Sequence, residues 1–278
     1  MTYKRILTVQ DISCVGQCSL TVALPILSVC GNETVMLPSA VLSTHTGGFK
    51  KPNFRDLSED IPKISAHWER EGIYFDAIYT GYLGSVSQID MVRDVMQRNG
   101  KPGCVKIVDP AMGDYGKLYA GFDEEYALAM RKLVAEADVA LPNITEAAML
   151  TGSEYRTEYD EAYIKELMEK LRALGTGAVV LTGVSYDSAH TGAAVMDEKG
   201  AFSYYRHAKF EKGWHGTGDI FASAFTGAYM GGKSMAEAAR IAADFAYRCI
   251  EVSQGDPTHT YGTKFELALP DLMGMLGR

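Results

Sequence analysis

The chain has 278 residues, of which 47% are hydrophobic and 22% are charged, as is ordinary for a globular enzyme. Its formal net charge is −8, and no run of lysine and arginine is long enough to follow a phosphate backbone, which argues against nucleic-acid or anionic-membrane binding as the main task. No apolar stretch reaches the roughly 18 residues of a membrane span, and the N-terminal segment lacks a signal-peptide cleavage site, so we expect a cytoplasmic protein with reduced cysteines.

Short runs rich in β-formers alternate with longer amphipathic segments, which is the pattern of βα units around a mostly parallel sheet. In chain order the predicted strands are 5–10, 33–37, 74–80, 104–108, 139–142 and 178–181. The predicted helices are 19–30, 58–71, 88–99, 124–136, 161–174, 219–230, 235–252 and 264–276. Two alternating runs between Thr191 and Arg206 predict an antiparallel hairpin. No repeat or linker interrupts this pattern, so we expect one α/β domain over residues 1–278.

Polar side chains stand at the carboxyl ends of five predicted strands. In open parallel sheets ligands bind at this edge, where loops lead into helices. The residues that follow the strands are Asp11, Tyr82, Asp109, Asn143 and Thr182. These side chains are therefore our first candidates for chemistry.

The segment His215-Gly216-Thr217-Gly218-Asp219 opens a predicted helix of small residues. Two glycines around Thr217 let backbone N–H groups converge on one point, where the helix dipole adds partial positive charge. Such a pocket suits a phosphoryl group in its transition state, and Asp219 beside it could deprotonate an attacking hydroxyl. The alternative is an ordinary helix entry with Asp219 as a capping residue. The small residues that follow favour the first interpretation, because close packing would bury the helix start and make an uncompensated carboxylate costly.

The segment from Gly227 to Ser234 formally satisfies the P-loop pattern G-x-x-x-x-G-K-S. A P-loop needs a strand before it, whereas here the predicted helix from Asp219 precedes it. We interpret the segment as a connection between two helices, in which Ser234 and Glu237 form a capping box. Lys233 is then a solvated lysine.

Two further segments carry carboxylates after strands. The turn Asp109-Pro110-Ala111-Met112-Gly113-Asp114 would hold Mg²⁺ in a protein that handles ATP, unless its acids are merely solvated. In Pro142-Asn143-Ile144-Thr145-Glu146, a capping box is a sufficient explanation, although Glu146 could also reach a hydrated magnesium ion. The loop His45-Thr46-Gly47-Gly48 could bind a ligand or only turn the chain.

Together these segments resemble the ribokinase-like superfamily and, within it, the pyridoxal kinases, nearly from end to end. The resemblance is carried by Thr80-Gly81-Tyr82-Leu83-Gly84-Ser85, by the turn from Asp109 to Asp114 with its continuation to Tyr119, by 142–146, and by Gly216-Thr217-Gly218-Asp219-Ile220-Phe221-Ala222. It implies a three-layer α/β/α fold, a homodimer, and phosphate transfer from MgATP to the 5′-hydroxymethyl group of pyridoxal, pyridoxamine or pyridoxine. Whether a monovalent cation is required is left open.

The resemblance also implies residue roles. Asp219 becomes the base, and the backbone of Gly216, Thr217 and Gly218 the anion hole. Phosphates and magnesium would be served by Asp109, Asp114, Asn143, Glu146 and Thr182, with Asp109 and Glu146 as metal ligands. Thr46, Tyr82 and Asp219 match substrate-side positions, and 206–214 would cover the adenine. Pyridoxal kinases commonly have serine where this chain has Asp11, an acid that could pair with a protonated ring nitrogen or an amine.

Two other functions remain open. A hydroxymethylpyrimidine kinase of thiamine synthesis would share the segment from Gly216 to Asp219. A nucleotide-binding regulator could keep the fold and lose turnover, although the intact Asp219 argues against it. A nicotinamide-dependent dehydrogenase gains little support, because no G-x-G-x-x-G turn follows the first strand.

Overall fold

A continuous nine-stranded sheet forms the centre of the computed structural model, which describes residues 3–211, 213–256 and 258–278. Its strands are β1 (Arg5–Ser13), β2 (Glu33–Leu42), β3 (Phe54–Asp56), β4 (Phe75–Thr80), β5 (Gly100–Val108), β8 (Val139–Ala140), β9 (Ala178–Val184), β10 (His190–Met196) and β11 (Phe202–Ala208). A separate hairpin consists of β6 (Gly113–Asp114) and β7 (Lys117–Leu118). The helices are α1 (Leu20–Val29), α2 (Ile61–Arg70), α3 (Val86–Asn99), α4 (Glu124–Ala135), α5 (Ile144–Thr151), α6 (Glu161–Leu174), α7 (Thr217–Met230), α8 (Met235–Ser253) and α9 (Phe265–Met275).

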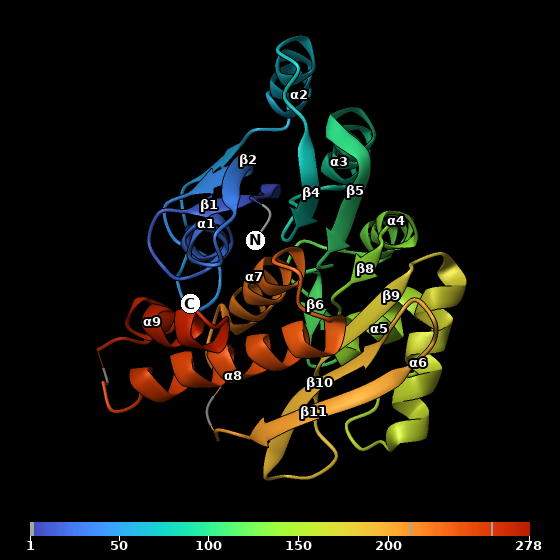
Figure 1. Ribbon diagram of the computed structural model, residues 1–278, viewed down its shortest axis with the longest axis vertical. Helices are drawn as coiled ribbons and strands as arrows, with labels where there is room; N and C mark the ends of the chain where they lie inside the picture. The colour runs from blue at the N-terminus through green and yellow to red at the C-terminus, as the bar shows by residue number, and fades with distance from the viewer. Residues whose placement is uncertain (1–2, 212, 257) are drawn as a thin grey trace.

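The strands are arranged in the order β11-β10-β9-β8-β5-β4-β1-β2-β3. Neighbours from β9 to β2 in this order are parallel, whereas β10, β11 and β3 pair antiparallel at the two edges (Figure 1). The predicted mixed α/β fold, with its mostly parallel sheet and the hairpin of β10 and β11, is confirmed. The prediction of a single domain stays a prediction.

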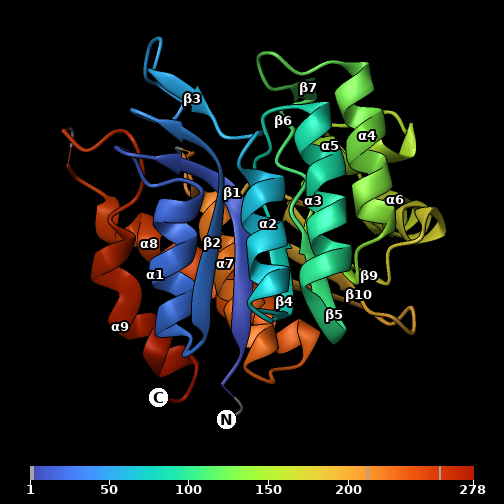
Figure 2. The same cartoon turned by 90° about the horizontal axis from the view of Figure 1, so that it is seen from above.

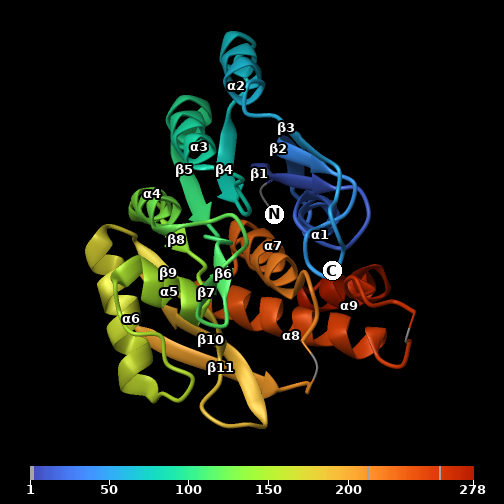
Figure 3. The same cartoon turned by 180° about the vertical axis from the view of Figure 1, so that it is seen from behind.

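Helices cover both faces of the sheet, and each face has its own apolar core. One core joins the sheet to α1, α7, α8 and α9, and the other joins it to α2 through α6 (Figure 3). Strands buried on both faces read as continuous apolar runs, which explains why the strand pattern was visible in the sequence.

The sheet changes direction between β1 and β4. After β1 the chain adds β2 on one side, and later it adds β5, β8 and β9 on the other side of β4. Loops leaving the carboxyl ends of these two neighbouring strands therefore diverge, and in α/β sheets the crevice where ligands bind lies at such a point. Figure 2 shows β3 and the β6–β7 hairpin at this end of the molecule, opposite the start of β1 and the end of α9.

Several sequence predictions need correction or can now be settled. Strand β1 does not end before Asp11, because its pairing with β2 resumes after an irregularity between Gln10 and Ile12. Asp11 therefore lies within the strand. The interpretation of 227–234 as a helix connection is confirmed, since α7 precedes it and Ser234 and Glu237 form a capping box at α8. Within the described residues, no helix is long and apolar enough to cross a membrane.

Candidate active site

The N-terminus of α7 presents free backbone amides at the crevice. Gly216 is the N-cap residue with φ of 78° and ψ of 1°, and no side chain caps the helix. The first intrahelical bond runs from the Ile220 N–H to the Gly216 carbonyl at 3.0 Å, so the amides of Thr217, Gly218 and Asp219 precede it. A Cβ added at Gly218 would meet nothing within 4 Å. Such amides favour an anion, in agreement with the predicted anion hole, which stays a prediction. The interpretation of Asp219 as a capping residue is wrong, because the N-cap is Gly216 and no side chain caps the helix.

Asp219 lies half-buried in the first turn of α7. Burial raises the pKa of its carboxyl to about 7, the backbone N–H of Ser19 donates a hydrogen bond that lowers it, and the negative charge of Asp11 raises it. A carboxylate with a pKa near the working pH is ionised often enough to accept a proton and basic enough to hold it. The environment of Asp219 therefore fits a general base.

The same pKa makes a prediction about stability. An acid whose folded pKa exceeds its unfolded value stabilises the fold fully below the unfolded pKa, and this contribution is lost as pH rises through the folded pKa, here between about 4 and 7. We expect Asp219→Asn to raise the free energy of unfolding by about 1 to 3 kcal/mol at pH 8 and to change it little at pH 4. Thermal melts at both pH values, with the exposed Asp94→Asn as control, test this. An equal effect at both would contradict it.

The turn after β5 carries two more carboxyl groups, of which Asp109 lies near Asp219. The pKa of buried Asp109 lies well above its ordinary value because of burial and of the charges of Glu146 and Asp219. Asp114 is exposed on β6, where burial of its carboxyl still raises the pKa. Two non-glycine residues of the turn, Ala111 and Tyr115, have positive φ values of 40° and 51°. Such strained backbone persists where the surrounding structure enforces it, and it is concentrated at functional sites.

Glu146 holds this turn in place from α5. Its Oε1 accepts the N–H groups of Met112 (2.9 Å) and Gly113 (3.4 Å), and its Oε2 accepts the N–H of Asn143 (2.9 Å). The predicted capping box is confirmed, and the Asn143 amide also donates to the Gly113 carbonyl at 2.8 Å. Burial raises the pKa of Glu146 to about 7, although its backbone hydrogen bonds lower it. Glu146 is thus a structural brace as well as a candidate ligand.

Asp109 and Glu146 fit a hydrated magnesium ion. Burial raises the pKa of both acids, and the charge of Glu146 raises that of Asp109 further, so a cation beside them would lower the cost of ionisation. No group of three or more His, Cys, Asp or Glu side chains that could hold a metal occurs among the described residues. Magnesium in phosphoryl-transfer sites needs only one or two carboxylates besides phosphates and water. The predicted metal ligands therefore stay a prediction.

Asp11 also lies near Asp219, and Tyr82 lies near Asp11. Asp11 is 4% exposed, and its charge acts on Tyr82, whose pKa is raised mainly by burial. The Tyr82 ring stacks on Phe122 with centroids 5.5 Å apart. In the loop after β2, Thr46 is exposed, whereas the neighbouring His45 is buried and hydrogen-bonds the Tyr261 carbonyl at 2.6 Å. Asp219 thus lies near both Asp11 and Asp109, and the substrate-side roles of Asp11, Tyr82 and Thr46 stay predictions.

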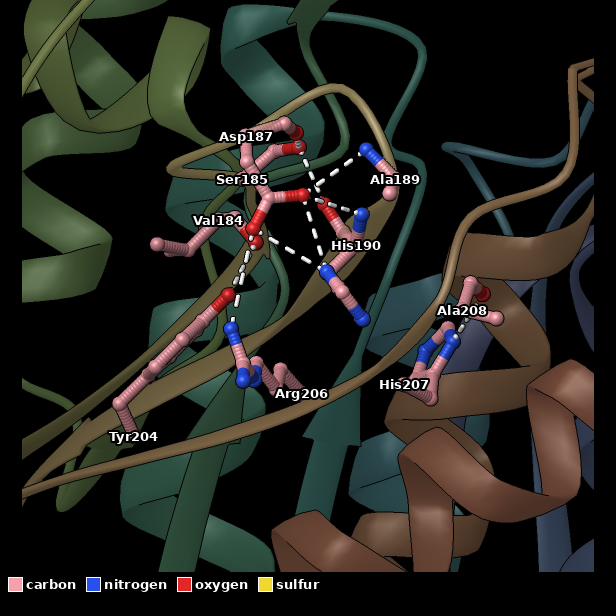
Figure 4. A network of polar contacts seen from close by, with 9 residues as sticks. All are labelled: Val184, Ser185, Asp187, Ala189, His190, Tyr204, Arg206, His207 and Ala208. Atoms are coloured by element: carbon pink, nitrogen blue, oxygen red, sulfur yellow. Dashed lines mark hydrogen bonds and ion pairs between the residues drawn. The ribbon is translucent and has the colours of Figure 1, made fainter.

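The backbone N–H of Thr182 donates to the Pro142 carbonyl at 2.9 Å. Thr182 does not follow a strand, as predicted, but lies within β9. The loop that follows it is fixed by Asp187, whose carboxylate accepts from the His190 ring at 2.9 Å and pairs with Arg206 at 3.7 Å (Figure 4). The hydrogen bond from His190 holds the pKa of Asp187 below its ordinary value. This network anchors β11 just before the chain enters 209–216 and the mouth of α7.

Three residues of this region escaped the sequence analysis. Ser19 contacts Asp219 through its backbone, as described above. Tyr119 lies near four carboxyls, and burial followed by their charges raises its pKa; they are those of Glu146, Asp109, Asp114 and Asp219. Tyr79 is fully buried beside Asp109 and Asp219. Tyrosines inside or beside apolar runs resemble core residues in the sequence. The only signal for Tyr119 was that the segment shared with pyridoxal kinases extends from Asp109 as far as this residue.

Comparison with known proteins agrees with this geometry. The family described as phosphomethylpyrimidine kinase matches residues 41–263. A Bacteroides thetaiotaomicron protein, proposed to be a phosphomethylpyrimidine kinase and crystallised with pyridoxal, is 36% identical with a TM-score of 0.92, over 98% of this chain and 96% of that one. The pyridoxal kinase of Lactobacillus plantarum is 32% identical with a TM-score of 0.89, over 99% and 98%.

The pyridoxal kinase of Arabidopsis thaliana is 31% identical over 187 residues, which are 65% of this chain and 58% of that protein. The chain thus spans less than two thirds of the length of this curated relative.

Proposed function

Since the chain belongs to the phosphomethylpyrimidine kinase family, we propose that it transfers the γ-phosphoryl group of ATP to the 5′-hydroxymethyl group of pyridoxal, pyridoxamine or pyridoxine. The observation that carries the proposal is the cluster of free amides at the N-terminus of α7, with Asp219 in the same helical turn. The pyridine substrate is supported by likeness to two structures over nearly their whole lengths, one a pyridoxal kinase and one crystallised with pyridoxal.

Each part of the site has a task in this reaction. The amides of Thr217, Gly218 and Asp219 receive the charge that gathers on the transferred phosphoryl oxygens. The Asp219 carboxylate accepts the proton of the attacking hydroxymethyl group. Asp109 and Glu146 would hold magnesium, which neutralises charge on the nucleotide phosphates. Asp114, Asn143 and Thr182 line the phosphate side, and Tyr82 can pack against a heteroaromatic ring.

Hydroxymethylpyrimidine is the second candidate substrate, because the matching family is described by that activity. Both substrates carry a hydroxymethyl group on a six-membered ring with nitrogen, and neither the amides of α7 nor Asp219 can tell them apart. Discrimination must come from side chains that touch the ring. A homodimer, a cytoplasmic location and a monovalent-cation requirement stay predictions.

Initial rates with MgATP and each of pyridoxal, pyridoxamine, pyridoxine and hydroxymethylpyrimidine test the proposal directly. We expect kcat/KM for at least one pyridine substrate to exceed that for the pyrimidine by about tenfold or more, which is within the reach of contacts in one pocket. A preference for the pyrimidine would replace the proposal by the second candidate. Nucleotide binding without phosphorylation of any of the four would instead indicate a regulator.

A further inference from the structure

The side-chain amide of Gln88 joins several segments beside the loop that carries Tyr82. Gln88 lies in the first turn of α3 and is fully buried. Its Oε1 accepts the Gly84 N–H at 2.7 Å, and its Nε2 donates to the Ser39 carbonyl of β2 and to the Ser58 hydroxyl, both at 3.0 Å. Because a backbone N–H only donates and a carbonyl only accepts, these partners fix which way the amide points. One side chain thus connects α3, the loop before it, β2 and the segment between β3 and α2.

Helix capping does not account for these contacts. Ser85 is the N-cap residue of α3 and its hydroxyl accepts the Gln88 N–H at 3.3 Å, so a capping box would direct the Gln88 side chain back to the Ser85 N–H. The amide instead bonds Gly84, one residue earlier, and Ser39, which is 49 residues away in the chain. Gln88 is therefore explained by the loop that it holds rather than by the helix that it begins.

Tyr126 of α4 holds the same loop from a second side. Its side chain is buried, and its hydroxyl donates to the Leu83 carbonyl at 2.7 Å. The Tyr126 ring stacks on Phe122 with centroids 3.7 Å apart, and Phe122 stacks in turn on Tyr82 with centroids 5.5 Å apart. Gln88 and Tyr126 thus fix the backbone that follows Tyr82, and the row of rings supports one face of its side chain.

A side chain that packs against a substrate contributes most when it is already in place, because ordering a mobile loop on binding costs entropy. Tyr82 is half-buried, which leaves part of its side chain free to meet a ring. We propose that Gln88 and Tyr126 are positioning residues, which act through Tyr82 on the binding of the substrate's ring and not on phosphoryl transfer. This role rests on the proposed function and extends the substrate side to the first turns of α3 and α4.

Substitution of Gln88 by methionine keeps the length of the side chain and removes its hydrogen bonds. With whichever of the four ring substrates the wild type prefers, we expect Gln88→Met to raise KM for that substrate by about 3- to 10-fold, the range that one aromatic contact supplies. The kcat and the KM for ATP should change by less than about twofold, because only binding of the ring is weakened.

Asn99→Leu is the matched control for Gln88→Met. Asn99 is a fully buried amide at the other end of α3, where it is hydrogen-bonded to Ser65 of α2. Its loss should lower the free energy of unfolding, as the loss of Gln88 does, since buried partners are left unpaired in both variants. The KM for the ring substrate should stay at the wild-type value in Asn99→Leu.

A double-mutant cycle with Tyr82→Ala separates positioning from a general loss of stability. Residues that act through Tyr82 lose their effect on KM once its ring is gone. In the Tyr82→Ala background, Gln88→Met should therefore leave KM for the ring substrate unchanged. A general loosening of the protein would raise KM by the same factor in both backgrounds. That equal factor, or an unchanged KM in Gln88→Met alone, overturns the proposal.

Tyr126→Phe keeps the proposal testable if Gln88→Met does not fold. It removes one hydroxyl and leaves the ring on Phe122, so we expect KM for the ring substrate to rise by about threefold, and not to rise when Tyr82 is already alanine. A wild type that phosphorylates none of the four substrates would defeat the proposed function. An active enzyme whose KM responds to neither variant would defeat the positioning role alone.

Discussion

Replacement of Asp219 by alanine is expected to lower kcat by about 10² to 10⁴, because the hydroxymethyl group then loses its proton acceptor. The affinity for ATP should change little, since the amides of Thr217 and Gly218 belong to the backbone and remain in place. Steady-state kinetics and calorimetric titration with a non-hydrolysable ATP analogue measure the two effects separately. If the variant turned over near the wild-type rate, the base would have to be a residue other than Asp219.

The pH profile gives the same assignment an independent check. Because the pKa of Asp219 is about 7, kcat/KM of the wild type should rise with pH through that value and level off above it. The residual kcat/KM of Asp219→Asn should no longer rise with pH near this value. Glu146 has a similar pKa, so Glu146→Gln is the matched control: it should keep the limb if Asp219 is responsible for it.

Most of the fold could be predicted because parallel strands buried on both faces leave a strong apolar signal. The same signal located the ends of β5 and β8, and hence Asp109 and Asn143, whereas Thr182 lies inside β9, which continues to Val184. The edge strand β3 was missed, since all three of its residues are exposed and no apolar alternation marks it. Strands β6 and β7 have two residues each, too few for any period to show.

The part of the site that could not be predicted depends on contacts between distant segments. Ser19 meets Asp219 only because α1 and α7 begin side by side, and nothing in a single sequence signals its positive φ. Glu146 looked fully explained by a local capping box, yet its carboxylate also holds the backbone of Met112 and Gly113. The local capping box was thus predicted correctly, whereas the contacts between distant segments appeared only with the structure.

The two glycines of the anion hole should respond very differently to alanine. Gly216 has a φ of 78°, and a Cβ there would overlap the carbonyl oxygen of Gln17 and lie 3.4 Å from the Cys18 sulfur. Left-handed backbone and a clash with main-chain atoms together should lower the free energy of unfolding by about 2 to 5 kcal/mol. Relief of the clash would also move the N-terminus of α7 away from the N-terminus of α1.

That displacement would misplace the amides and separate Ser19 from Asp219, so we expect Gly216→Ala to lower kcat/KM by about 10²-fold or more even where the protein remains folded. Gly218→Ala is the matched control, because its φ is not positive and its Cβ would meet nothing within 4 Å. Its free energy of unfolding should stay within about 1 kcal/mol of the wild type, since alanine is the better helix former. Chemical denaturation and kinetics on the same preparations measure both quantities. The opposite outcome is that Gly216→Ala proves as stable and as active as Gly218→Ala. The close contact between the N-termini of α1 and α7 would then not be what positions the amides relative to Asp219.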